Sequence, residues 1–161
     1  MPYPEILKGK RFLVVDDEKD VLETIQDQLP DSEVVTSTNF KDAQQLIHSQ
    51  KFDLAILDIM GVDGFDLLTE CRKESLPAAM LTAHSITIES INKSIKLGAV
   101  SFLPKEELFR LADLLAEILS GLSEGRSHWE RLFERLGPFF KNRLGLTWED
   151  LEKPPSPPYS Y

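Results

Sequence analysis

The residues of this chain that could do chemistry stand where apolar runs end. Asp16 and Asp17 follow the run 12–15, and Asp58 follows the run 52–57, within the stretch LDIMGVDGFD. A carboxylate at the boundary of a buried strand is costly unless a cation meets it. The rest of the sequence must therefore supply a partner for these three acids.

Two more polar residues follow later apolar runs. Thr82 comes after the run 78–81, and Lys105 lies two residues past the run 100–103. One ammonium group and one hard divalent cation bound by oxygens would together neutralise the acids. Mg2+ fits best, because it accepts one or two carboxylates, keeps several waters and can take further oxygens from a phosphoryl group.

The elements that must position these side chains alternate along the chain. Short apolar runs are separated by longer windows in which apolar residues recur every three or four positions. Strand and helix alternating five times predict a parallel sheet with helices on both faces, a doubly wound α/β domain. The expected strands are 11–15, 33–37, 52–57, 78–81 and 100–103, and the expected helices are 20–29, 40–48, 64–72, 87–97 and 106–119.

The polarity of the runs indicates their places in the sheet. The runs 12–15 and 54–57 are continuously apolar, as in central strands, whereas 33–36 is more polar and suits an edge. In such a sheet, ligands bind beyond the carboxyl ends of the strands, where the acids, Thr82 and Lys105 should converge. The expected helix caps are Asn39 before the second helix, Ser85 ahead of the fourth and Gly98 after it.

Composition narrows the class of protein. A chain of 161 residues with 42% hydrophobic content fits one domain with a short appendage. A net charge of -9 argues against nucleic-acid binding, which depends on clustered Lys and Arg. The single cysteine, Cys71, is expected to be an ordinary thiol in a helix. Without a leader-like segment or a long apolar run, we expect a cytoplasmic protein that does not attach to a membrane.

Four motifs in combination resemble the receiver domain of bacterial two-component response regulators, the CheY-like family. They are FLVVDDEKDV, LAILDIM, MLTAHS and VSFLPKEEL, and the resemblance covers about residues 9 to 120. The resemblance implies a flavodoxin-like, five-stranded parallel sheet of order 2-1-3-4-5. It also implies a phosphoryl group received from a sensor histidine kinase or a phosphotransfer protein.

The resemblance assigns a role to each residue at the strand ends. Asp58 would be the phospho-acceptor, and its carboxylate would attack the phosphoryl group. Mg2+ would be held by Asp58, by Asp17 directly, by Asp16 directly or through water, and by the backbone carbonyl of Met60.

The remaining implied roles belong to a conformational switch. Lys105 would pair with the phosphate, and Thr82 would donate its hydroxyl group to it. Phe102 would be the aromatic whose inward or outward rotamer follows Thr82. The surface expected to change is formed by residues 85–119.

The sequence departs from the family pattern in two places. The loop after Asp58 is two residues shorter than usual, and Gly61 and Gly64 could allow a tighter path through positive φ values. Glu106 stands where the family usually has proline, so the cis peptide bond expected there should be absent. Asp63 and Asp66 are expected to cap and charge the start of the third helix.

The division expected from the sequence is a receiver domain at 1–120 and a C-terminal extension at 121–161. The extension should hold an amphipathic helix, kinked by Pro138, and a proline-rich tail. Its aromatic stripe either packs on this chain's own fifth helix or docks on another copy or a separate target. The apolar residues of the stripe are Trp129, Leu132, Phe133, Leu136, Phe139 and Phe140.

Three functions remain open at this stage. The favoured one is a stand-alone receiver, not an enzyme on other substrates, which switches contacts with a downstream protein and could form a homodimer. A second is a phosphatase with an aspartyl-phosphate intermediate, although Met60 stands where that class normally has a second Asp. A third is a phosphate-independent scaffold that keeps only the fold of a receiver.

Overall fold

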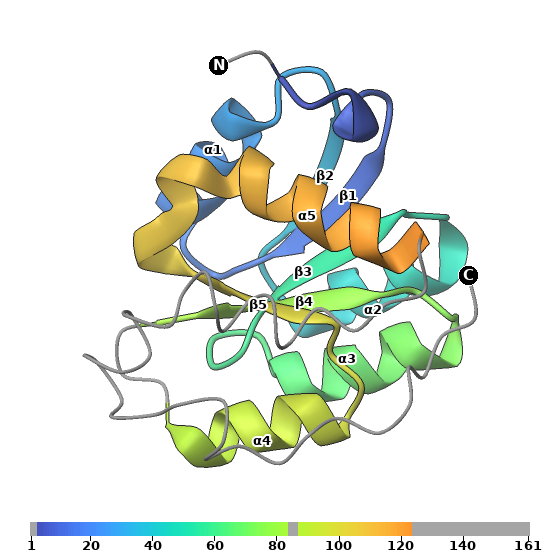
Figure 1. Cartoon of the computed structure of the whole chain (residues 1–161). Helices are drawn as coiled ribbons and strands as arrows, with labels where there is room; N and C mark the ends of the chain where they lie inside the picture. Colours follow the sequence, from blue (N-terminus) through green and yellow to red (C-terminus); the bar gives the residue numbers. More distant parts are fainter. Residues whose placement is uncertain (1–2, 84–86, 124–161) are drawn as a thin grey trace.

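The computed structural model describes residues 3–83 and 87–123 of the chain. They form a five-stranded parallel sheet of order β2-β1-β3-β4-β5, as predicted (Figure 1). The polar strand β2 lies at one edge, and the two continuously apolar strands, β1 and β3, are interior. The strands are β1 Arg11–Val15, β2 Glu33–Ser37, β3 Leu54–Asp58, β4 Ala78–Thr82 and β5 Ser101–Pro104.

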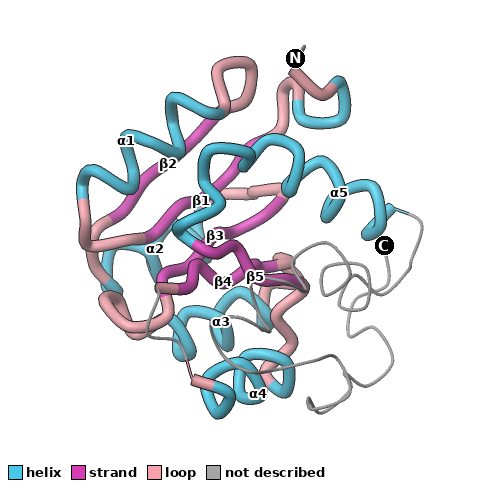
Figure 2. The backbone as a smooth tube through the Cα atoms, turned by 60° about the vertical axis from the view of Figure 1, so that its left-hand side comes forward, coloured by secondary structure: helices cyan, strands magenta, loops and turns pink. Residues whose placement is uncertain are grey.

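Helices cover both faces of this sheet. α1 and α5 lie on one face, whereas α2, α3 and α4 lie on the other (Figures 1 and 2). The α-helices are α1 Lys19–Gln28, α2 Phe40–Ser49, α3 Gly64–Lys73, α4 Ile88–Lys96 and α5 Leu111–Ser123, and two 3-10 helices are η1 Glu5–Leu7 and η2 Lys105–Arg110. No helix within the described ranges is long and apolar enough to cross a bilayer.

Strand β1 shows how one apolar run fills two cores. Phe12 and Val14 pack in the layer under α1 and α5, and Leu13 and Val15 pack in the layer under α2, α3 and α4. All four side chains are completely buried. Because successive side chains of a strand point to opposite faces, a strand covered on both sides must be apolar at every position.

Local chemistry explains most of the helix boundaries. Asn39 caps α2 as predicted, since its side chain accepts a hydrogen bond of 2.9 Å from the Asp42 backbone N–H. Gly98 follows α4 with a φ of +94°, a conformation that glycine adopts without strain. The N-cap of α4 is Thr87, which accepts from the Ser90 N–H at 3.1 Å. The expected cap, Ser85, lies outside the described residues.

The prediction for the last helix was wrong at both ends. Residues 105–110 form the 3-10 helix η2, and the α-helix begins only at Leu111. At the other end α5 continues to Ser123, four residues beyond the predicted end at position 119. Leu119 and Gly121 are both buried there, so packing holds this part of the helix. The expected C-terminal extension lies outside the described residues from position 124 on.

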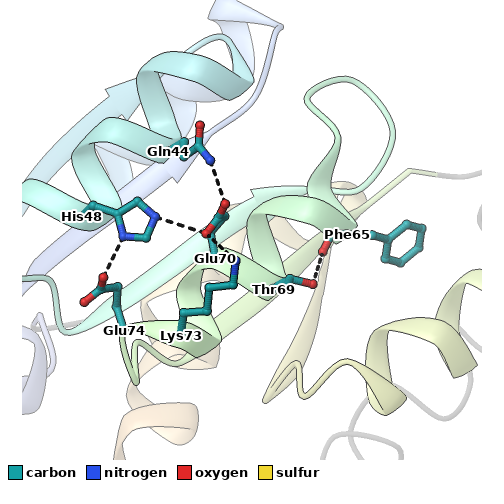
Figure 3. Close-up of polar contacts among 7 residues, drawn as sticks. All are labelled: Gln44, His48, Phe65, Thr69, Glu70, Lys73 and Glu74. Atoms are coloured by element: carbon teal, nitrogen blue, oxygen red, sulfur yellow. Dashed lines mark hydrogen bonds and ion pairs between the residues drawn. The ribbon is translucent and has the colours of Figure 1, made fainter.

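The side chain of His48 joins α2 to α3 (Figure 3). Its Nδ1 lies 2.7 Å from Glu74 Oε1 and its Nε2 lies 3.1 Å from Glu70 Oε2. Ionised carboxylates only accept hydrogen bonds, so both contacts require the doubly protonated imidazolium form. The hydrogen bond to Glu74 is the main cause that raises the pKa of His48.

Candidate functional site

The register of the strands brings the predicted site residues to one edge of the sheet. Val15 lies beside Leu57, so Asp16 and Asp58 come at the same level of neighbouring strands. Asp58 is the last residue of β3, Thr82 is the last residue of β4, and Lys105 follows directly after β5. Parallel strands thus place residues that are far apart in the sequence around one pocket.

Three carboxylates gather in this pocket. Asp16, Asp17 and Asp58 each offer an oxygen, and these oxygens all lie within 4.8 Å of one another. Asp16 is completely buried and Asp58 is 5% exposed, whereas Asp17 is exposed to solvent. The site therefore has two interior carboxylates and one that faces water.

Lys105 supplies the cation that the acids require. Its Nζ lies 2.9 Å from Asp16 Oδ2 and 3.5 Å from Asp58 Oδ1. Burial lowers the pKa of Lys105, but the close contact with the Asp16 carboxylate and the charge of Asp58 outweigh burial, so the pKa is raised. The ammonium group is consequently charged at neutral pH and stands between the two interior acids.

The surroundings of Asp58, in contrast to those of Lys105, disfavour the charged form of its side chain. Burial, followed by the nearby Asp16 carboxylate, raises the pKa of Asp58, while Lys105 and the Gly61 N–H partly offset this. The Gly61 N–H donates to Asp58 Oδ2 at 3.1 Å. Asp58 therefore remains short of positive charge even with Lys105 in place, which is the condition of a carboxylate that can bind a metal ion.

Asp16 gives a direct test of whether a metal ion fits. Its Oδ1 accepts a hydrogen bond from the Glu18 N–H at 2.8 Å. Its Oδ2 is buried and, within the described part of the chain, has no hydrogen bond, because Lys105 approaches it as an ion pair without hydrogen-bond geometry. A buried oxygen of this kind needs a further partner. The all-oxygen donor set around it suits Mg2+.

Gly61 keeps the space in front of these carboxylates open. A Cβ at this position would lie 2.5 Å from Asp17 Oδ1 and 2.6 Å from Asp58 Oδ2. Any other residue would therefore displace the acids. The sequence suggested that Gly61 and Gly64 would have positive φ, but the structure corrects this, because the positive φ of the loop, +54°, falls on Asp63.

The loop 59–63 returns tightly to α3. A Cβ on Gly64 would collide with the backbone oxygen of Asp58, so glycine is needed there for space as well. Asp63 occupies the N-cap position but makes no side-chain capping bond, contrary to the prediction. Asp66 lies in the first turn of α3, as predicted. The Met60 side chain is 78% exposed, and its backbone carbonyl as a metal ligand stays a prediction.

The two switch residues lie in neighbouring strands. Thr82 is 4% exposed at the end of β4, and Phe102 in β5 is completely buried. Phe102 lies beside Met80 and packs in the core layer under α3 and α4. The described residues contain no cis peptide bond, which agrees with the expectation for Lys105 and Glu106.

A doubly wound α/β domain with three acids and a lysine beyond the carboxyl ends of its strands defines a class of fold, the flavodoxin-like domains. Comparison with known families gives the particular one. The pattern of the response regulator receiver domain matches residues 12–118 of this chain. The chain therefore belongs to the response regulator receiver family.

Two relatives and one solved structure show how far the similarity extends. The chain is 33% identical over 120 residues to the response regulator protein PilR of Pseudomonas aeruginosa, covering 70% of this chain and 27% of PilR. It is 31% identical over 140 residues to the transcriptional regulatory protein TctD of Salmonella typhimurium, covering 80% of this chain and 62% of TctD. The CheY-like receiver domain protein of Methanospirillum hungatei has the same fold, with a TM-score of 0.65 and 24% identity over 73% of this chain and 98% of that one.

Proposed function

We propose that this chain is a response regulator receiver that accepts a phosphoryl group on Asp58. The observation that carries the proposal is the Lys105 ammonium group, 3.5 Å from Asp58 Oδ1 and 2.9 Å from Asp16 Oδ2. A cation held at that point can pair with a phosphate formed on Asp58. The donor would be a phosphohistidine of a sensor histidine kinase or a phosphotransfer protein.

The chemistry is a displacement at phosphorus. A carboxylate oxygen of Asp58 forms the new P–O bond as the P–N bond to the donor imidazole breaks, and the imidazole leaves neutral after taking a proton. The Gly61 N–H orients Asp58 through Oδ2, and Lys105 faces the negative charge of the incoming group. Asp16, Asp17 and Asp58 would hold Mg2+, which would supply charge neutralisation at the phosphoryl oxygens.

The switch follows from added charge. Phosphorylation brings about -1.5 to -2 charges and three acceptor oxygens to Asp58. Thr82 would donate its hydroxyl group to them, and Phe102 would change its packing as Thr82 moves. A shift from about 1:99 to 99:1 needs roughly 5.5 kcal/mol. Two or three charge-assisted hydrogen bonds at about 1.5 to 3 kcal/mol each would supply it.

The output is proposed to be protein contact. α4, β5 and α5 would change with the switch and bind a downstream protein or a second copy of the chain. The net charge of -9 disfavours DNA as a direct ligand of these 161 residues, so a protein surface is the proposed target. The only catalysis by the chain would be its own phosphorylation and dephosphorylation. The curated relatives are longer, and the chain spans 27% of PilR and 62% of TctD.

The direct test is mass spectrometry of the protein after incubation with Mg2+ and acetyl phosphate. One added phosphoryl group is expected on the parent chain and none on Asp58→Asn. Asp63→Asn, which changes an exposed acid of the same loop, is the matched control and should be modified like the parent. An unmodified parent chain, or equal modification of Asp58→Asn, would contradict the proposal.

A further inference from the structure

A groove that the proposed phosphorylation does not use runs between α1 and the η2–α5 segment. It consists of two adjoining hollows of about 540 Å³ and about 410 Å³. Gln28 and Phe109 line both hollows, so the two adjoin at these residues. One end is lined by Lys105 and Glu18, beside the acidic pocket, and the other end by Tyr3 near the N-terminus.

Phe109 is the apolar centre of the groove. Its side chain is 72% exposed, although a phenylalanine is among the residues that gain most from burial. Val21 and Leu108 line the hollow on one side of it, and Ala112 lines the hollow on the other side. An aromatic side chain exposed in a depression, with apolar neighbours on both sides, is typical of a site that receives another apolar group.

The rim of the groove is acidic. Asp20, Asp27 and Asp113 are exposed and line it, and no described Lys or Arg forms an ion pair with any of them. The two basic residues of the lining are already engaged. Lys105 pairs with Asp16, and Arg110 pairs with Glu107 at 2.7 Å. The groove therefore fits an occupant with apolar side chains flanked by positive charge.

The chain contains such a segment beyond α5. Residues 126–143 include five Lys or Arg residues against two Glu residues, the reverse of the -9 balance of the whole chain. Trp129, Leu132, Phe133 and Leu136 recur every three or four positions, so a helix would present them on one side. This stripe supplies apolar side chains that suit the apolar centre of the groove, and its flanking positive charge is opposite to that of the acidic rim.

The segment can also reach the groove. α5 spans thirteen residues from Leu111, next to Phe109, to Ser123, which is about 20 Å at 1.5 Å per residue. Six residue-to-residue steps lead from Ser123 to Trp129, and an extended chain covers up to about 3.5 Å per step, or about 20 Å. A return of the extended chain along α5 would therefore be long enough to bring Trp129 to the level of Phe109.

We propose that residues 126–143 dock in the α1–α5 groove of the same chain, with the stripe of Trp129 against Phe109. A segment docked there would lie beside Lys105 and Glu18, which line one end of the groove. The docking does not depend on the phosphoryl chemistry, because it rests on the groove and on the sequence after Ser123.

Tryptophan fluorescence of the full-length chain tests the docking. The two tryptophans of the chain, Trp129 and Trp148, both follow Ser123, and Trp148→Phe leaves Trp129 as the single reporter. In this background we expect blue-shifted emission and weak quenching by acrylamide. Phe109→Glu should shift the emission to the red and increase quenching several-fold, because it places a charge where the indole would pack.

Two matched controls separate the groove from general effects. Met60→Glu places the same charge at a side chain that is 78% exposed on the loop after β3, and it should leave Trp129 unchanged. Asp20→Lys with Asp27→Lys should weaken docking, whereas Glu23→Lys, an exposed acid of α1 outside the groove lining, should not. Circular dichroism would verify that each variant is folded.

Three results would overturn the proposal. Trp129 already exposed to water in the parent chain would show that the segment awaits a different partner. A blue shift that grows with protein concentration would show that the segment docks on a second copy. Equal spectra for the parent and Phe109→Glu would show that the indole is buried somewhere other than this groove.

Discussion

Replacing Lys105 by Met is expected to destabilise the metal-free protein by about 3 kcal/mol at pH 7, the lower end of the cost of breaking a buried ion pair. The Lys105 side chain is 19% exposed, while those of Asp16 and Asp58 are 0% and 7% exposed. Methionine keeps an unbranched side chain of similar length and removes the charge. The two interior carboxylates would then face each other without a cation.

Protonation of one carboxylate sets an upper limit to this loss. From an ordinary aspartate pKa of 3.8, neutralising one acid costs about 1.36 × 3.2, or about 4 kcal/mol, at pH 7. At pH 5 the same step costs only about 1.36 × 1.2, or about 2 kcal/mol. The loss of stability in Lys105→Met should therefore shrink between pH 7 and pH 5.

Urea denaturation followed by circular dichroism, with EDTA present, measures both values. The control is Lys73→Met, since the Lys73 side chain is 64% exposed and its Nζ lies 3.5 Å from Glu70 Oε2. An exposed pair of that kind should contribute no more than about 1 kcal/mol. The reasoning is refuted by a loss below about 1 kcal/mol in Lys105→Met at pH 7, or by a loss that is the same at pH 5.

Three further substitutions test other parts of the structure. Burial raises the pKa of Asp58 in the folded protein, so ionisation of this carboxyl group lowers the free energy of unfolding as the pH rises above 3.8, its pKa in the unfolded chain. Asp58→Asn should therefore stabilise the metal-free protein at pH 7 by on the order of 1 kcal/mol in urea denaturation. A destabilised variant would contradict this reasoning. Gly61→Ala should weaken Mg2+ binding about tenfold in calorimetry by displacing the carboxylates, whereas Met60→Ala next to it should not. Because the pKa of His48 is raised in the folded protein, the stability that its link between α2 and α3 contributes is fully present below pH 6.5 and is lost as the pH rises through the pKa of the folded state. NMR of the imidazole ring should show a pKa above 6.5. His48→Gln should remove the contribution of this residue to the pH dependence of the urea midpoint.

The strands were predictable because a buried strand is a short run of apolar residues, which can be read directly from the sequence. β1 and β2 begin and end where the sequence predicted, since apolar runs bounded by polar residues coincide with the length of chain that the sheet covers. The start of α5 was not predictable in this way. Residues 105–110 carry the same three-and-four spacing as the helix after them, and the difference between 3-10 and α geometry depends on how the chain leaves β5.

The grouping of the acids and the lysine at the strand ends was predictable for a related reason. Side chains that follow successive parallel strands must meet at one edge, so Asp16, Asp58 and Lys105 could be grouped without coordinates. Their backbone partner was missed. The Gly61 N–H that holds Asp58 leaves no signal in the identity of a side chain, and the open space that requires glycine there is a property of the folded loop.

The sequence by itself determined the order of strands and helices, which residues stand at the strand ends, and the balance of three acids and one lysine. These follow from periodicity and residue type, which are local properties of the chain. Only the tertiary structure decided that Lys105 pairs with Asp16 while the adjacent Asp17 faces solvent. Successive side chains point in opposite directions, so which of two neighbouring acids is buried depends on the strands and helices packed around them.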